Sequence, residues 1–358
     1  MLQIYPEYEN SYAKDFARLF MTEGSEYKKF LFGTNNLAIE LSKILPVDGY
    51  INTYSDKKEF MGKPLLNKIE AIPENALVLS CVYLGSIIII MRKLSKFRFR
   101  SCDCYSFIKA AKLPIELFHF TGWKEDIETH REKYNTVFDR LEDEESKNVF
   151  QNLVNFKFSG DTKYLEGFNP PTDEQYFDDC LELPDNPVFA DIGGYDGLTT
   201  KKFIEHYPSY KEVFFFEPEA KNIKTAKENL SDYKNIHFIQ KGLSDKNTTL
   251  HFSVNESASM ICEDGESSIE VAKLDDVVNS EINFLKMDIE GAEGGAIEGA
   301  KNTIKKWHPN MAICVYHKPD DFWKIPEQVL SIRDDYKLFM RHYTQGSDET
   351  VMFFIPKH

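Results

Sequence analysis

The sequence is poor in the features that mark secreted and zinc-binding proteins. It has six cysteines in 358 residues, with no Cys-x-x-Cys pair and no Cys/His set at zinc spacing. Scattered cysteines of this kind are typical of reduced thiols, so we expect a cytoplasmic protein. The first residues, MLQIYPEYENSYAKDF, lack a basic segment followed by an apolar one, and no secretory signal is expected.

Long apolar runs are also missing. The most apolar stretch, 76–91, is shorter than the roughly 18–20 residues that span a bilayer. It is interrupted by Ser80, Gly85 and Ser86. We therefore expect no membrane span, and we predict a buried strand at 76–81 that leads into a helix.

The chain also lacks an excess of basic residues. The chain carries 43 Lys and Arg against 58 Asp and Glu, a formal net charge of −15. Such a chain repels phosphate backbones, so we expect no nucleic-acid partner, and a small-molecule or glycan acceptor suits it better. With 42% hydrophobic and 28% charged residues, the chain is long enough and apolar enough for two globular domains.

The pattern of elements predicts an α/β protein in three parts: a Rossmann-like domain over 1–120, a helical linker over 121–180, and a larger α/β domain over 181–358. In the first part a strand at 30–32 meets Gly33, and a helix and a strand at 49–51 follow. The alternation then repeats, with strands at 76–81 and near 97–101 and helices at 86–95 and 105–111. Asn35 and Ala38 stand where a dinucleotide loop would have its later glycines. The first domain could therefore bind a nucleotide or be a degenerate module for substrate presentation or assembly.

The linker has helical periodicity over 123–156, and we predict that the acidic run 142–146 divides it into two helices. The third part alternates strands with helices, and two final strands joined by 344–348 predict an antiparallel hairpin. A strand-like insertion is expected at 248–276, near the site. The parallel strands are predicted at 188–190, 213–216, 237–240, 284–287 and 311–315, and the helices at 199–206, 220–230, 293–306 and 326–333.

The segment VFADIGGYDGLTT, 188–200, is the first candidate binding motif. Asp191 ends an apolar strand, glycines at 193, 194 and 197 follow, and Thr199 opens a helix. Glycines allow positive φ and a close approach of the backbone to a ligand. An acid two positions before the first glycine, with the wide Gly193-x-x-x-Gly197 spacing, favours S-adenosylmethionine, because its sulfonium and amino groups attract carboxylates.

Glu217 ends the next strand, where an acid can accept hydrogen bonds from both ribose hydroxyls, although a surface Glu that opens a helix would look the same. The loop after the third parallel strand is expected to line the adenine site. The remaining residues that we assign to the cofactor in these loops are Gly194, Tyr195, Asp196, Pro218, Gly242, Leu243 and Ser244.

Three carboxylates, Asp288, Glu290 and Glu293, follow the fourth parallel strand. They could hold substrate, orient the cofactor amine or bind a cation, and Glu293 could equally stabilise the start of a helix. His317 follows the fifth strand at the same sheet edge, and we predict that it is the general base, with Asp288 and Glu290 orienting it or the acceptor. Asp288 is assigned to the cofactor as well.

We predict that side chains along the last strands and the loops before them contact the acceptor: Glu293, Tyr316, Lys318, Trp323, Arg341, His342 and Tyr343. No metal site is assigned, although a metal-dependent variant stays open if Asp288, Glu290, His317 and His342 approach one another.

The motifs resemble those of the FkbM family of S-adenosylmethionine-dependent methyltransferases. The matching segments are DIGGYDG (191–197), FEPEAKN (216–222), GLSD (242–245), LDD (274–276), FLKMDIEGAE (284–293) and VYHKPDDFWKIP (315–326). The resemblance implies a Class I methyltransferase fold, a seven-stranded sheet with a C-terminal antiparallel hairpin. It also implies O-methylation of a hydroxyl, often on a sugar or polyketide, with Asp191, Gly193, Gly197, Glu217 and Asp288 framing the cofactor.

Two other functions remain alternatives at this point. Two α/β domains also suit a nicotinamide-dependent oxidoreductase acting on a sugar nucleotide, although the single glycine of GTNNLA and the wide spacing of DIGGYDG argue against it. A non-catalytic binding protein on a methyltransferase fold is the other alternative, and the intact set of Asp191, Glu217 and Asp288 argues against that.

Overall fold

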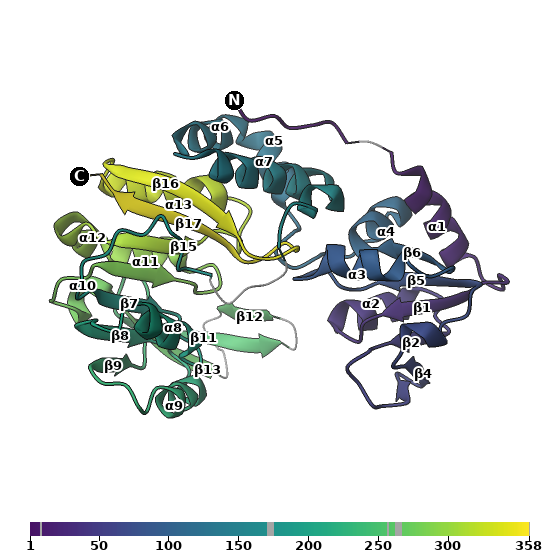
Figure 1. Ribbon diagram of the computed structural model, residues 1–358, viewed down its shortest axis with the longest axis horizontal. Helices are drawn as coiled ribbons and strands as arrows, with labels where there is room; N and C mark the ends of the chain where they lie inside the picture. Colours follow the sequence, from purple (N-terminus) through teal and green to yellow (C-terminus); the bar gives the residue numbers. More distant parts are fainter. Residues whose placement is uncertain (8, 170–174, 256–257, 262–266, 358) are drawn as a thin grey trace.

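The computed structural model describes residues 1–7, 9–169, 175–255, 258–261 and 267–357. Its strands form a six-stranded sheet near the N-terminus, a four-stranded sheet and a seven-stranded sheet. In Figure 1 the N-terminal sheet and the seven-stranded sheet lie at opposite ends of the molecule, and the helices of the linker bridge them. The chain is an α/β protein, as the alternating pattern predicts.

The N-terminal sheet has the strand order β3-β4-β2-β1-β5-β6, and the pairs from β4 to β6 are parallel. The predicted β-α-β start is confirmed, but the strand expected at 97–101 lies at 100–103 and the short pair β3 and β4 was missed. The elements are α1 (Ser11–Met21), β1 (Lys28–Phe32), α2 (Asn36–Ile44), β2 (Gly49–Ile51), β3 (Glu59–Phe60), β4 (Lys63–Leu66), η1 (Ile69–Ala71), β5 (Ala76–Ser80), α3 (Ile87–Leu94), β6 (Arg100–Asp103) and α4 (Cys104–Ala111).

Asn35, which stands where a dinucleotide loop would have a glycine, caps the helix α2. Its side-chain oxygen accepts a hydrogen bond from the Ala38 amide at 3.1 Å, and its Nδ2 donates to the Cys81 carbonyl at 2.9 Å. An asparagine in this position stabilises a helix N-terminus by satisfying an otherwise unpaired amide. The residue that departs from the dinucleotide pattern therefore ties the β1–α2 turn to the end of β5.

The linker contains three helices, α5 (Trp123–Thr129), α6 (Arg131–Arg140) and α7 (Glu144–Ser159), and a short 3-10 helix, η2 (Thr162–Leu165). The prediction of two helices missed the break at His130. The acidic run acts as a helix start: the Asp143 side chain accepts a hydrogen bond from the Ser146 amide at 2.7 Å, and Glu144 and Glu145 lie in the first turn. Carboxylates stabilise a helix N-terminus because of the helix dipole.

The seven-stranded sheet has the order β16-β17-β15-β14-β7-β8-β9, with β16 and β17 antiparallel and the strands from β15 to β9 parallel. The predicted parallel strands and C-terminal hairpin are confirmed to within two residues at each end. The order and the antiparallel edge are those of the Class I methyltransferase fold. The strands are β7 (Val188–Ile192), β8 (Glu212–Phe216), β9 (Ile236–Ile239), β14 (Phe284–Met287), β15 (Asn310–Cys314), β16 (Tyr336–His342) and β17 (Thr350–Pro356).

The helices of this part differ from prediction at three places, one of which is the short helix α10 (Leu274–Val277), which was not predicted. The helix expected at 293–306 is split at Ala300 into two, and the helix expected at 326–333 begins five residues earlier, with Pro326 inside it. Pro326, the first residue of the expected range, lies in the second turn of the helix. The helices are α8 (Leu198–His206), α9 (Ala220–Asn229), α10 (Leu274–Val277), α11 (Glu293–Gly299), α12 (Lys301–Trp307) and α13 (Asp321–Ile332).

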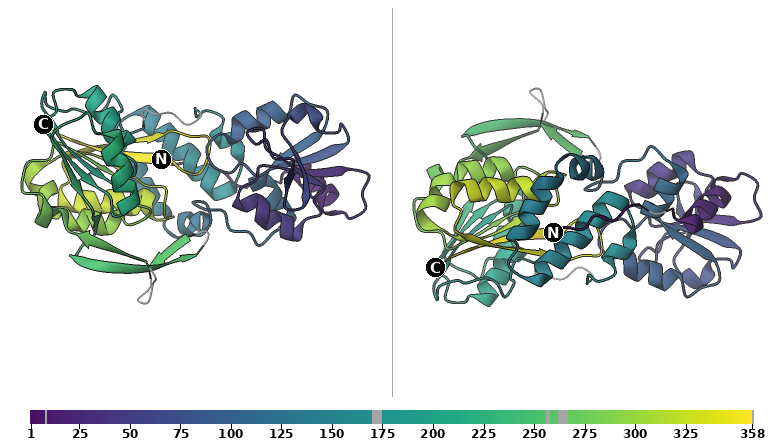
Figure 2. Two further views of the ribbon diagram at one scale, coloured as in Figure 1. Left: turned by 90° about the horizontal axis from the view of Figure 1, so that it is seen from below. Right: turned by 90° about the horizontal axis from the view of Figure 1, so that it is seen from above.

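The strands of the insertion and the preceding strand β10 form the four-stranded sheet with the order β10-β13-β11-β12. Figure 2 shows that its long strands lie outside the layer of the main sheet. Its strands are β10 (Gly242–Leu243), β11 (Thr248–Asn255), β12 (Ala258–Ile261) and β13 (Ser267–Ala272). The predicted strand-like insertion is confirmed.

Polar contacts join the linker and the N-terminal part to the C-terminal hairpin. Arg341 of β16 donates to Asp143 at 2.8 Å, to Ser146 at 2.8 Å and to Asp178 at 3.0 Å. The loop between the last two strands reaches the N-terminal part, where the Gln345 amide donates to the Gly85 carbonyl at 2.6 Å. These contacts attach the linker to the end of β16 and the N-terminal part to the loop before β17.

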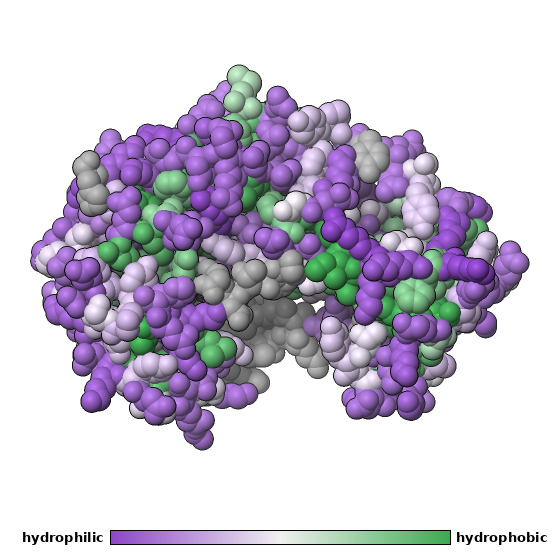
Figure 3. Space-filling view, viewed as in Figure 1, coloured by the Kyte–Doolittle hydropathy of each residue, from purple (hydrophilic) through white to green (hydrophobic). Residues whose placement is uncertain are grey.

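The surface shown in Figure 3 is mostly hydrophilic, with apolar residues in small separate groups. Within the described part of the chain, no helix combines the length and the apolar character needed to cross a membrane.

Candidate functional site

The candidate site lies at the carboxyl ends of four neighbouring strands, β8, β7, β14 and β15. The glycine-rich turn follows β7, Glu217 follows β8, Asp288 follows β14 and His317 lies three residues after β15. In an open parallel sheet, ligands bind at this edge. The order of the strands therefore brings together motifs that are up to 126 residues apart, from Asp191 to His317.

The glycines of the turn allow it to lie against the neighbouring strands. Gly193 has φ +79°, and a Cβ there would lie 2.0 Å from the Asp288 carbonyl oxygen. A Cβ on Gly194 would lie 2.2 Å from the Phe215 ring, and the amides of both glycines donate to the Phe216 carbonyl at 3.0 Å. A side chain at either position would push the turn away from β14 or β8.

Asp191 is fully buried, and its carboxylate is engaged within the protein. It lies 3.2 Å from the Lys286 ammonium and accepts a hydrogen bond from the Thr200 hydroxyl at 2.7 Å. Lys286 also donates to the Gly193 carbonyl at 2.6 Å. Sequence reasoning singled out Thr199 and missed Thr200 and Lys286, because only the folded packing shows which hydroxyl and which ammonium face the acid.

Glu217 is 6% exposed at the end of β8. Its carboxylate accepts hydrogen bonds from the Tyr195 amide at 3.1 Å, the Glu219 amide at 2.9 Å and Asn222 Nδ2 at 3.2 Å. Burial raises the pKa of Glu217, although these donors oppose the shift. The acid is thereby held in one orientation beside the turn, and the side chain of Tyr195 next to it is 63% exposed.

The other residues assigned to the cofactor occupy different surroundings. Asp196 accepts a hydrogen bond from the Leu198 amide at 3.1 Å, and Pro218 follows Glu217 in the same loop. Gly242 and Leu243 form the strand β10, and Leu243 is buried. The Ser244 amide donates to the Ala272 carbonyl at 2.9 Å, so this segment is tied to the four-stranded sheet.

Asp288 is the polar centre of the other half of the site. It accepts hydrogen bonds from the Tyr176 hydroxyl at 2.8 Å and the Tyr316 hydroxyl at 3.5 Å, and its Oδ1 lies 3.4 Å from His317 Nε2. Burial alone would raise the pKa of Asp288, but His317 and Lys286 outweigh it and hold the pKa well below its usual range. Asp288 is therefore a carboxylate at any ordinary pH.

His317 lies among carboxylates, with its side chain only 3% exposed. Its Nδ1 is 3.0 Å from Glu293 Oε1, and its Nε2 is 3.8 Å from Glu290 Oε2. Burial opposes the charged form, but Asp288 and Glu293 outweigh it and raise the pKa of His317 to about 10. In this arrangement His317 is an imidazolium at neutral pH, which argues against the predicted role as a base that takes a proton directly.

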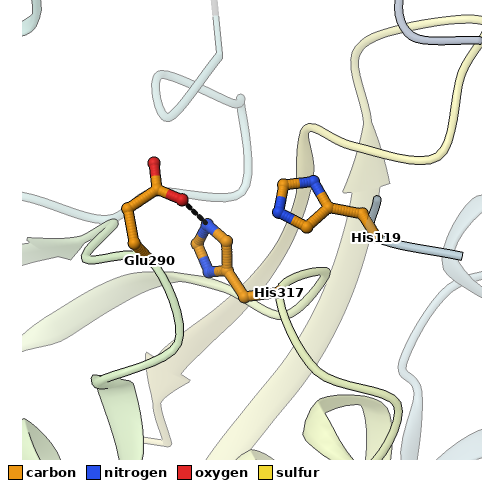
Figure 4. Close-up of side chains that lie close together, drawn as sticks. All are labelled: His119, Glu290 and His317. Atoms are coloured by element: carbon orange, nitrogen blue, oxygen red, sulfur yellow. Dashed lines mark ion pairs between the residues drawn. The ribbon is translucent and has the colours of Figure 1, made fainter. Parts of the chain in front are cut away.

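His119, which sequence reasoning did not select, lies beside His317. It comes from the loop 112–122 before α5, and its ring centroid is 5.3 Å from that of His317 and 5.0 Å from that of Tyr316. Burial and the nearby charge of His317 lower the pKa of His119 to about 3, so it is neutral. A lone histidine in a loop about 200 residues away carries no sequence signal for this placement. Figure 4 shows the imidazole of His119 facing His317, with Glu290 on the other side.

The residues assigned to the acceptor divide into two groups. Glu293, Tyr316 and Lys318 lie at the cluster, where the Lys318 ammonium donates to the Gly291 carbonyl. The other four contact different parts of the protein. Trp323 Nε1 donates to Asp126 at 3.0 Å, and Arg341 pairs with Asp143 and Asp178. His342 Nδ1 is 2.9 Å from the Thr350 hydroxyl, and Tyr343 is partly buried beside the core of the hairpin.

Comparison with known proteins agrees with the motifs and the fold. A model of the methyltransferase FkbM domain matches residues 191–344. The 2-O-methyltransferase NoeI of Sinorhizobium fredii (strain NBRC 101917 / NGR234) is 27% identical over 174 residues, with 40% of this chain and 71% of that protein covered. The crystal structure of methyltransferase FkbM from Methylobacillus flagellatus KT has the same fold, with a TM-score of 0.76 at 21% identity, over 96% of this chain and 93% of that one. Residues 191–344 of this chain thus carry a methyltransferase FkbM domain.

Proposed function

We propose that the chain transfers a methyl group from S-adenosylmethionine to a hydroxyl of a sugar or a related small polar acceptor. The observation that carries this proposal is the cluster of Asp288, Glu290 and His317 at the sheet edge, next to the turn and the acid that fit the cofactor. The similarity to a 2-O-methyltransferase supports oxygen as the methyl acceptor.

The residues at β7 and β8 fit the cofactor. Glu217 presents an oriented carboxylate that can accept hydrogen bonds from a ribose diol, and Gly193 lets the turn pack directly against the end of β14. When bound, S-adenosylmethionine supplies an electrophilic methyl group on a sulfonium. Asp288 adds a permanent negative charge nearby, which stabilises a cationic ligand.

The acceptor side of the site is rich in groups that bind hydroxyls. Glu290 is 79% exposed beside His317, and carboxylates accept hydrogen bonds from the neighbouring hydroxyls of a polyol. The work of such an enzyme is mainly to align the acceptor oxygen with the methyl group and exclude water. In this proposal the protonated His317 orients Asp288 and Glu290, and the hydroxyl proton leaves to water.

Glu217→Ala is expected to weaken S-adenosylmethionine binding about 10-fold to 100-fold, because hydrogen bonds to a charged group contribute roughly 1.5–3 kcal/mol. Isothermal titration of the purified chain measures the effect. Glu219→Ala is the matched control, since Glu219 is exposed and its contact with Glu217 uses only its backbone amide. Equal affinities for both variants would contradict the assignment of Glu217.

The activity itself is tested with methyl-labelled S-adenosylmethionine and a panel of sugars, sugar nucleotides and simple alcohols. We expect label in a sugar ether that survives alkaline treatment, which hydrolyses methyl esters. A thermal-shift comparison with NAD and NADP accompanies the assay. Stabilisation by a nicotinamide cofactor, with no labelled ether, would favour the oxidoreductase alternative instead.

A further inference from the structure

We propose that His119, His317 and Glu290 bind a divalent transition-metal ion, so that the linker loop completes the methyltransferase site. The three residues come from three segments: the loop before α5, the turn after β14 and the turn after β15. The use of this ion in catalysis rests on the function proposed above, but its binding does not.

The geometry places suitable ligand atoms close together. One atom from each of His119, Glu290 and His317 lies within 4.8 Å of the other two. Metal–ligand bonds of about 2.0–2.2 Å put ligand atoms roughly 3–4 Å apart, so a shift of about 1 Å would close the site. Figure 4 shows His317 between the other two side chains.

The ring nitrogens at this place are incompletely satisfied. Among the residues that the structure describes, His119 Nδ1 is buried and has no hydrogen-bond partner, and the ring nitrogens of His317 have only carboxylate oxygens nearby, at 3.0–3.8 Å. An unsatisfied buried polar group is costly, and the His317 side chain is only 3% exposed. A cation between the rings would satisfy one nitrogen of each.

Glu293 contacts His317 in the way that a carboxylate usually contacts a metal-binding histidine. Its Oε1 lies 3.0 Å from His317 Nδ1 and also accepts a hydrogen bond from the Ile289 amide at 3.0 Å, and Glu293 is 1% exposed. A carboxylate at one ring nitrogen fixes the tautomer and leaves the other nitrogen free to bind a metal. Here the other nitrogen, Nε2, faces Glu290.

Asp288 provides a further oxygen on the same side of the ring, with its Oδ1 3.4 Å from His317 Nε2. A second possible set, Asp288, Glu293 and His317, also has its ligand atoms within 4.8 Å. In that set the carboxylates of Asp288 and Glu293 contact different nitrogens of the His317 ring. Such an arrangement fixes the ring, whereas two ligands of one ion would lie on the same side of it. We therefore assign Glu293 as a positioning residue.

The charges and the donor types favour a transition metal. Three carboxylates lie within 4 Å of the His317 ring nitrogens, so the site attracts a divalent cation. Two imidazoles with carboxylates suit Zn²⁺, Mn²⁺ or Fe²⁺ better than Mg²⁺, which prefers oxygen ligands. The carbonyl of His119 accepts a hydrogen bond from the buried Lys157 ammonium, which anchors the loop.

Such an ion would bind the acceptor hydroxyl and lower its pKa. The hydroxyl proton then passes to water, the O–CH₃ bond forms as the S–CH₃ bond breaks, and the sulfur keeps the bonding electron pair as a neutral thioether. No oxidant or reductant is needed. The ion would thus activate the hydroxyl without a separate general base.

The binding is tested on chelator-treated full-length chain by calorimetric titration with ZnCl₂, MnCl₂ and MgCl₂. We expect one equivalent of Zn²⁺ or Mn²⁺ to bind at least 10-fold more tightly than Mg²⁺. The cobalt-loaded chain should show visible absorption bands of a site with nitrogen ligands. Failure of both transition metals to bind, or binding of Mg²⁺ with equal affinity, would overturn the proposal.

The ligands are tested with His119→Asn and Glu290→Gln. Asparagine tolerates the left-handed backbone at residue 119, where φ is +55°, and Glu290 is exposed, so both variants should fold. Each is expected to weaken metal binding at least 10-fold and to change the cobalt spectrum. His237→Asn is the control, because His237 is half exposed on β9 and pairs with Glu212. Wild-type affinity in both ligand variants would overturn the assignment.

The two proposals fail in different ways. Metal binding without methyl transfer to any hydroxyl would leave the metal site standing and remove the proposed function. Methyl transfer that is unaffected by the chelator would keep the function and overturn the catalytic use of the metal. If both proposals hold, the chelator should abolish transfer and Zn²⁺ or Mn²⁺ should restore it.

Discussion

Replacing Lys286 by Met is expected to lower the free energy of unfolding by about 3–5 kcal/mol, the cost of removing one partner from a buried ion pair. Asp191 has no exposed surface, and the substitution would leave its charge without the ammonium that lies 3.2 Å away. It would also remove the hydrogen bond to the Gly193 carbonyl. Urea unfolding followed by circular dichroism measures the change.

Lys301→Met is the matched control, because Lys301 lies on the surface and its pair with Glu298 is half exposed. A surface pair contributes at most about 1 kcal/mol, so the control should unfold almost as the parent does. Adding Asp191→Asn to Lys286→Met should recover part of the stability by removing the unpaired charge. A loss of less than about 1 kcal/mol in Lys286→Met would show that the buried pair is not needed.

Gly193→Ala is the second substitution for which we expect a large effect: loss of measurable S-adenosylmethionine binding and a lower melting temperature. The new Cβ would lie 2.0 Å from the Asp288 carbonyl oxygen, so the turn and the end of β14 would have to separate. That separation displaces the turn from both Glu217 and Asp288. Calorimetric titration with the cofactor and a thermal melt measure the two effects.

Gly62→Ala separates the collision from the backbone strain. Gly62 has φ +72°, close to the +79° of Gly193, but nothing lies within 4 Å of its Cβ position. Both alanine variants bear the cost of a left-handed backbone, about 1–2 kcal/mol. Only Gly193→Ala should lose cofactor binding. Similar behaviour of the two variants would mean that strain alone accounts for the effect.

The local patterns were sufficient for most of the secondary structure. Alternating apolar strands and helices predicted the parallel strands of the large sheet, because a buried parallel strand needs a continuous apolar run and a crossover helix. The predicted helix boundaries were less exact. The helix expected at 326–333 begins at Asp321, with Pro326 inside it. The acidic run 142–146 separates two helices, as predicted, and also provides the cap and first turn of α7.

Candidate site residues were found where a motif lies directly after a strand. Glu217, Asp288 and His317 were found in this way, since the carboxyl ends of parallel strands meet at one edge. Arg341 and Trp323 were chosen for their chemistry near that edge. In the structure Arg341 pairs with Asp143 and Asp178, and Trp323 donates to Asp126, so tertiary packing uses these side chains to attach the linker.

The sequence by itself determined the α/β class, the order of the elements and the strand-end motifs, because these depend on short-range periodicity and on residues a few positions apart. Only the tertiary structure decided which side chains meet. It paired Asp191 with Lys286 in the interior, surrounded His317 with carboxylates that keep it charged, and brought His119 from the linker to face it. These contacts join residues 95, 24 and 198 positions apart, and their energies depend on burial and neighbouring charge, which no local pattern encodes.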